Sequence, residues 1–105
     1  MQHLKELNLL IDKASTIAGS DYKLAQQLGV PRQSVSNWRY GRKTATPADQ
    51  VLIADIAGLD PIDALANATI EMYADRKKGD DIKRALTRAM SSWKKYLSTE
   101  ISASL

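Results

Sequence analysis

The chain has 105 residues, 44% of them hydrophobic, and a formal net charge of +3, which suits one small domain with a modest core. It has no cysteine, which excludes a disulfide framework, a cysteine-ligated zinc finger and a cysteine redox site. No apolar run approaches the roughly 20 residues of a membrane span, and the first residues mix charges into a helical pattern unlike a signal peptide. We therefore expect a cytoplasmic protein without a membrane partner.

The charge is distributed in blocks along the chain. Residues 31–46 carry four basic side chains and no acid, residues 47–75 carry six acids and no base, and residues 76–97 carry eight bases and two acids. Basic blocks suit a polyanion such as DNA. The acidic block either points away from that partner or toward a basic surface of another subunit, and a simple solvated face explains it equally well.

The first element we expect is an amphipathic helix over residues 3–18. Its apolar side chains recur at steps of three and four residues, at Leu4, Leu7, Ile11, Ala14, Ile17 and Ala18. Gly19 ends this helix, and Ser20 or Asp21 can cap the next one. The single histidine, His3, is expected to be an exposed terminal residue because no catalytic or metal-binding partner accompanies it.

Residues 21–40, DYKLAQQLGVPRQSVSNWRY, predict two short helices joined at Gly29. Glycine takes the left-handed conformation that often follows a helix end, and Pro31 then fixes φ for a new start. The apolar residues of each helix share one face, with Leu24, Ala25 and Leu28 on the first and Val35 and Trp38 on the second. Two such faces must pack together, which predicts a helix-turn-helix.

The outward face of the second helix is polar. It presents Arg32, Gln33, Ser36 and Asn37, followed by Arg39 and Tyr40. Arginine can pair with the O6 and N7 atoms of guanine, glutamine and asparagine can pair with adenine, and serine can bond to a base or to the backbone. We therefore expect this face to bind double-stranded DNA.

Three further helices follow in the sequence. Thr46 and Pro47 predict the start of a fourth helix that ends before Gly58, and Asp60 and Pro61 predict a fifth that runs to about residue 77. After a hinge around Gly79, a sixth helix over residues 81–97 carries one apolar stripe, formed by Ile82, Leu86, Met90, Trp93 and Leu97. This stripe is expected to form a dimer interface; packing on its own domain and a DNA contact through its basic side chains are the alternatives.

The segment LAQQLGVPRQSVSNWRYGRK resembles the helix-turn-helix of the Cro/C1-type repressor family, also called the xenobiotic-response-element family, over about residues 20–60. The resemblance implies an all-α fold, with a compact five-helix, lambda-repressor-like DNA-binding domain over residues 1–78 and a helical extension over 79–105. It makes the second helix the recognition helix, whose expected base-reading residues are Arg32, Gln33, Ser36 and Asn37. The expected phosphate-binding residues are Tyr22, Lys23, Arg39, Tyr40, Arg42, Lys43 and Thr44.

The sequence departs from the family pattern at two places. Pro31 stands where a serine or threonine usually caps the recognition helix, so the side-chain cap is missing. Arg39 and Tyr40 replace the usual acidic residue of the exit turn, which makes this surface more basic.

The function expected from these features is a sequence-specific transcriptional regulator. The resemblance favours a compact phage or prophage repressor that binds a palindromic operator as a homodimer and associates with the nucleoid in that state. One alternative is an antitoxin that binds DNA with the same helix and a toxin with residues 80–105; another is a helical interaction module that does not bind DNA. We expect no enzymatic activity, cofactor or metal, because no nucleophile with a base, carboxylate pair or histidine cluster is present in the pattern. A protein antirepressor is a further expected type of partner.

Overall fold

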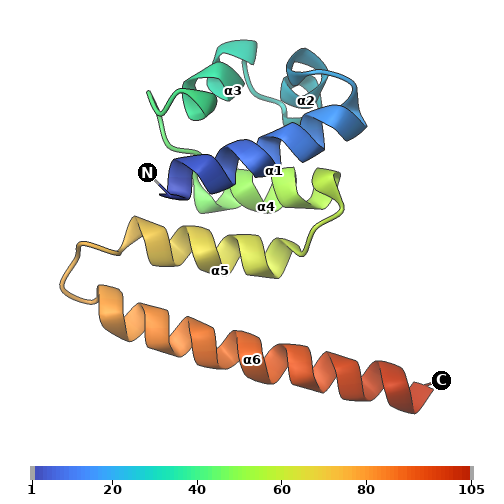
Figure 1. The fold of residues 1–105 in the computed structure, drawn as a ribbon, viewed down its shortest axis with the longest axis vertical. Coiled ribbons are helices and arrows are strands. Elements are labelled where there is room, and N and C mark those ends of the chain that lie inside the picture. Colours follow the sequence, from blue (N-terminus) through green and yellow to red (C-terminus); the bar gives the residue numbers. More distant parts are fainter. Residues whose placement is uncertain (1, 105) are drawn as a thin grey trace. The chain divides into compact units, whose positions relative to one another are not determined.

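The computed structural model describes the backbone of residues 2–104 and the side chains of residues 4–92. Over this range the chain forms six α-helices and no strand (Figure 1). They are α1 (Gln2–Ala18), α2 (Asp21–Leu28), α3 (Arg32–Arg39), α4 (Pro47–Ala57), α5 (Pro61–Met72) and α6 (Gly79–Ser104). The expected all-helical fold is confirmed.

The chain divides into two compact units, residues 1–65 and residues 66–105. The expected boundary lies between residues 78 and 79, whereas this division falls within α5. The first turn of that helix belongs to the earlier unit and the rest belongs to the later one. The apolar pattern of a continuous helix contains no signal for such a division.

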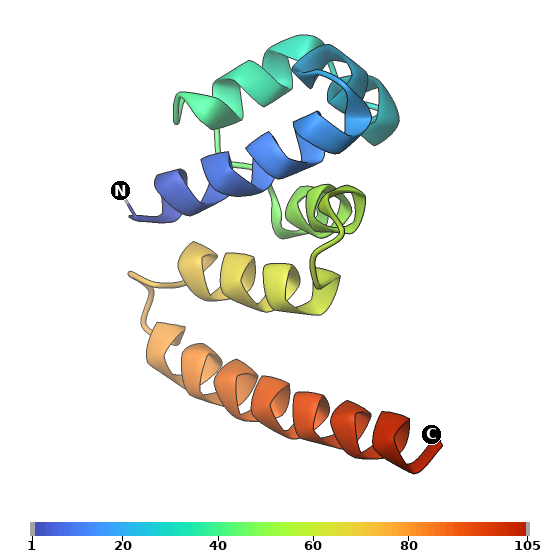
Figure 2. The ribbon, with the colours of Figure 1, turned by 45° about the vertical axis from the view of Figure 1, so that its right-hand side comes forward.

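The core of residues 1–65 is built around α1. This helix packs against α2, α3 and α4, and it runs between the α2–α3 pair and α4 in both views (Figures 1 and 2). The largest side chains in this core are completely buried, and they come from all four helices: Ile11, Leu24, Val35 and Ile53.

The helix ends in this unit follow the expected local chemistry. The side chain of Ser20 caps α2 by accepting from the backbone N–H of Lys23, and that of Thr46 caps α4 by accepting from the N–H of Asp49. Gly29 and Gly58 end α2 and α4 in the left-handed conformation, with φ of 71° and 73°. Pro31 provides no side-chain cap to α3, because the proline side chain has no hydrogen-bond acceptor.

The helices of the later unit differ in length from the expectation. α5 ends at Met72 instead of near residue 77, because the following residues form single turns with bonds between residues three apart, such as Ala74 N–H to the Glu71 carbonyl and Arg76 N–H to the Tyr73 carbonyl. Gly79 begins α6 close to the Tyr73 carbonyl, where a Cβ would approach that oxygen to 2.2 Å. The close approach at the start of α6 therefore depends on a residue without a side chain.

Within the part of the chain that the structure describes, no helix is both long enough and apolar enough to cross a membrane.

Candidate nucleic-acid interface

The helices α2 and α3 pack together through their apolar faces. Leu24 and Ala25 of α2 and Val35 and Trp38 of α3 are all buried in one core. The turn between the helices is closed by the Val30 N–H, which donates to the Ala25 carbonyl at 3.0 Å. The inner faces of the two helices are thus buried in the core, and of α3 only the opposite face is accessible to a ligand.

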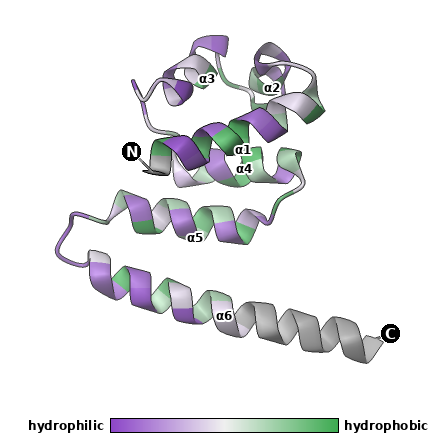
Figure 3. Cartoon of the chain, in the orientation of Figure 1, coloured by the Kyte–Doolittle hydropathy of each residue, from purple (hydrophilic) through white to green (hydrophobic). Residues whose placement is uncertain are grey.

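The outer face of α3 is polar and open to solvent. Figure 3 shows mainly hydrophilic colours on this helix. Arg32 and Gln33 are exposed, and Ser36 and Asn37 are half-buried. A hollow on this face is lined by Asp21, Arg32, Gln33, Ser36, Arg39 and Tyr40. Three of the four expected base-reading residues, Arg32, Gln33 and Ser36, therefore line one hollow, and Asn37 follows Ser36 on the same helix.

Several side chains of this face are bonded to one another. Gln33 Nε2 donates to Asn37 Oδ1 at 3.2 Å, and Arg42 Nε donates to the same oxygen at 2.9 Å. Arg42 Nη2 also donates to Ser36 Oγ at 2.8 Å, and its guanidinium lies 5.0 Å from the centre of the Tyr40 ring. Three of the four expected base readers, Gln33, Ser36 and Asn37, thus form one network with a residue of the exit turn.

The other expected phosphate-binding residues lie at the borders of α2 and α3. Tyr22 and Lys23 are exposed in the first turn of α2, and the Tyr22 hydroxyl accepts a bond from Gln26 Nε2. Lys43 and Thr44 are exposed in the loop after α3. This loop is fixed to the core because Ala45 is buried and its carbonyl accepts from Gln50 Nε2 at 3.0 Å.

Arg39 is the expected phosphate-binding residue that the structure uses differently. Its Nε and Nη2 donate to the two carboxylate oxygens of Asp21 at 2.8 and 2.9 Å, and its Nη1 donates to Asp12 at 2.6 Å. Only 22% of its side chain is exposed. Arg39 lines the hollow beside Tyr40 as expected, but two carboxylates already hold its guanidinium. We therefore do not retain it as a phosphate contact.

Sequence reasoning missed the residues that hold Arg39 in place. Asn8 Nδ2 donates to the Arg39 carbonyl at 2.9 Å, and Asn8 Oδ1 accepts from Arg39 Nη1 at 3.3 Å. Ser15 Oγ donates to Asp21 at 2.5 Å. Asn8, Asp12 and Ser15 follow one another at steps of four and three, which places them on one stripe of α1. This polar stripe beside the apolar stripe of α1 is the sequence signal that could have predicted a partly buried polar contact.

The ionic contacts shift the pKa values of both partners in the direction of their charged forms. The hydrogen bonds from Arg39 lower the pKa of Asp21, with a smaller contribution from Ser15, and outweigh the opposite effect of burial. The bond to Asp21 raises the pKa of Arg39 in the same way. The interaction joins the end of α3 to α1 and to the start of α2, and so fixes the orientation of α3.

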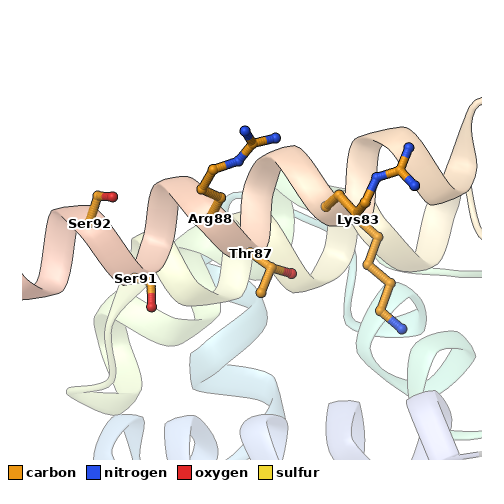
Figure 4. A pocket seen from close by; sticks show the side chains of 6 residues that line it. Lys83, Thr87, Arg88, Ser91 and Ser92 are labelled. Carbon is orange, nitrogen blue, oxygen red and sulfur yellow. The ribbon is translucent and has the colours of Figure 1, made fainter.

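The expected dimerisation stripe falls partly outside the described side chains. Ile82, Leu86 and Met90 are half-buried on one face of α6, whereas the side chains of Trp93 and Leu97 lie outside the described residues. The helix also carries a hollow between side chains of its own surface (Figure 4). Its lining consists of basic and hydroxyl residues: Lys83, Arg84, Thr87, Arg88, Ser91 and Ser92. Arg84 forms an ion pair with Asp81.

Comparisons with protein-family models, with curated protein sequences and with solved structures gave no significant match.

Proposed function

We propose that this protein is a sequence-specific regulator of transcription that binds double-stranded DNA through α3. The observation that carries the proposal is the division of α3 into two faces. Val35 and Trp38 are buried against the core, while Arg32, Gln33 and Asn37 share the opposite face. An α-helix fits the major groove, and these three side-chain types are the ones that recognise base edges there.

Charge around this face supports the same proposal. Lys23 lies at the start of α2, and Lys43 lies in the loop after α3. Lysines at such borders bind phosphates and position a helix in the groove without reading sequence. In this proposal Tyr22 and Thr44 donate hydroxyl hydrogen bonds to the same backbone.

The regulator is proposed to act as a homodimer and a repressor. Two copies of α3 would enter successive major grooves about 34 Å apart on a palindromic operator and so block the promoter. The apolar stripe that begins with Ile82, Leu86 and Met90 on α6 is the proposed dimer surface.

The test is selection of bound sequences from a random duplex pool, with the native protein and with a variant in which Arg32, Gln33 and Asn37 are replaced by alanine. We expect the native protein to enrich an inverted repeat and the variant to retain only salt-sensitive, nonselective binding. The matched control replaces Lys5 and Lys13, two exposed residues of α1. This control removes more positive charge than the test variant and should enrich the native motif.

Three outcomes contradict the proposal or a part of it. Absence of an enriched motif with the native protein refutes sequence-specific binding. Enrichment of the same motif by the triple variant refutes the assignment of α3 as the reading element. A motif without inverted symmetry refutes only the dimer.

A further inference from the structure

Arg42 is brought over the recognition face by the way in which α3 ends. The Gly41 N–H donates to the Trp38 carbonyl, and the Arg42 N–H donates to the Asn37 carbonyl at 2.9 Å. This pair of bonds is a Schellman motif, which requires a residue in the left-handed conformation after the helix. Gly41 supplies that conformation with φ of 71°. The chain therefore turns back, and Arg42 lies next to Asn37 instead of continuing into the loop.

The Arg42 guanidinium is then held in one orientation. One edge of it donates to Asn37 Oδ1 and Ser36 Oγ at 2.9 and 2.8 Å, and its Cζ atom lies over the Tyr40 ring. Two bonds from one edge of a planar group, together with the ring contact, hold the guanidinium beside α3. A guanidinium held in this way presents its free donors as an oriented fork, which suits a base edge whose two acceptors have fixed positions.

The hydrogen-bond inventory of this group leaves donors for a ligand. A guanidinium has five N–H donors, and the two bonds to α3 use one from Nε and one from Nη2. The remaining donors are both N–H groups of Nη1 and the second of Nη2. They lie at the end of the side chain and form the fork that pairs with O6 and N7 of guanine.

The same inventory changes the role of Asn37. An amide oxygen has two lone pairs, and Asn37 Oδ1 already accepts from Gln33 and from Arg42. Pairing of asparagine with adenine requires this oxygen to accept from the N6 amino group. With both lone pairs occupied, Asn37 is able to hold Arg42 but is not available for that adenine contact.

We propose that Arg42 is a specificity-determining residue that reads a guanine in the major groove, and that Asn37 is a positioning residue for it. The inference rests on the function proposed above and deepens it. It replaces the earlier assignments of Arg42 to phosphate and of Asn37 to a base.

The experiment compares the native protein with Arg42→Lys in selection from a random duplex pool. Lysine keeps the charge but lacks the fork. We expect the variant to lose preference for guanine at one position of each half-site while it retains the other preferences. On a fixed native site, its affinity should fall roughly 5- to 150-fold, the range for loss of one bidentate base contact.

Lys43→Ala is the matched control, since Lys43 is the exposed neighbour of Arg42 in the same loop. It should weaken binding to all sequences alike and leave the enriched motif unchanged. Asn37→Ala removes one of the two bonds that orient Arg42. It should therefore weaken the guanine preference at the Arg42 position and remove no separate adenine preference.

The outcomes separate the two proposals. If the native protein enriches no motif, the DNA-binding function itself fails. If it enriches a motif that Arg42→Lys leaves unchanged, the function stands and the guanine contact is refuted. Loss of an adenine preference in Asn37→Ala, with guanine retained, shows that Asn37 reads a base directly and also overturns the inference. Circular dichroism of each variant checks that the helices are intact.

Discussion

Replacing Arg39 with alanine should destabilise the protein by about 2 kcal/mol. Its contact with Asp21 joins two pairs of atoms at 2.8 and 2.9 Å, but 40% of the Asp21 side chain is exposed, so solvent screening reduces this contact to about 1 kcal/mol. The Asp12 carboxylate is 60% exposed, and its contact contributes about 0.5 kcal/mol. Loss of packing around the largely buried stem of Arg39 accounts for roughly another 0.5 kcal/mol.

Thermal unfolding followed by far-UV circular dichroism measures this effect. For a domain of this size, about 2 kcal/mol corresponds to a decrease in Tm of roughly 10 °C. Arg32→Ala is the matched control because it changes the same residue type at an exposed position of the same helix. It should alter stability by no more than about 0.5 kcal/mol. Equal Tm values for the two variants would refute a structural role for Arg39.

Three further predictions concern Asp21, Thr46 and Gly29. The folded-state pKa of Asp21 is lowered. The stabilisation that the Asp21 carboxylate contributes is therefore present above the unfolded pKa and is lost as pH falls below about 4. Asp21→Asn should flatten the acid side of a plot of Tm against pH. Thr46→Ala removes the cap of α4 and should cost about 1 kcal/mol in urea unfolding, whereas Thr44→Ala should change little. Gly29→Ala meets no atom within 4 Å but places a Cβ at φ of 71°, so it should cost about 1 kcal/mol from backbone strain alone; an unchanged urea midpoint would contradict this.

The fold was predictable where one local rule decides the outcome. The apolar spacing of α1, the glycine after Leu28 and the threonine and proline before α4 each act within a few residues, and the structure agrees with all of them. The end of α5 at Met72 was not predictable in this way. Helical bonds and single-turn bonds compete closely after that residue, and the apolar pattern through Tyr73 does not distinguish them.

The candidate site was predictable as a set of residues but not as a set of bonds. Periodicity places Arg32, Gln33, Ser36 and Asn37 on one face, which the structure confirms. It cannot tell that the guanidinium of Arg39 is held by carboxylates from two other helices, because those residues lie 18 and 27 positions away in the chain. A count of basic residues treats every arginine as available to a ligand, and only the tertiary fold distinguishes a paired one.

The burial of Trp38 gives residues 1–65 an optical signal of their own. The chain has two tryptophans, and Trp38 lies in the core of this unit with 5% of its surface exposed. Replacing Trp93 with phenylalanine leaves Trp38 as the only tryptophan, so its fluorescence reports the opening of the core between α1, α2 and α3. Far-UV ellipticity, in contrast, records every helix. Coincident unfolding curves from the two signals identify one cooperative transition, and separate curves assign a stability to each unit.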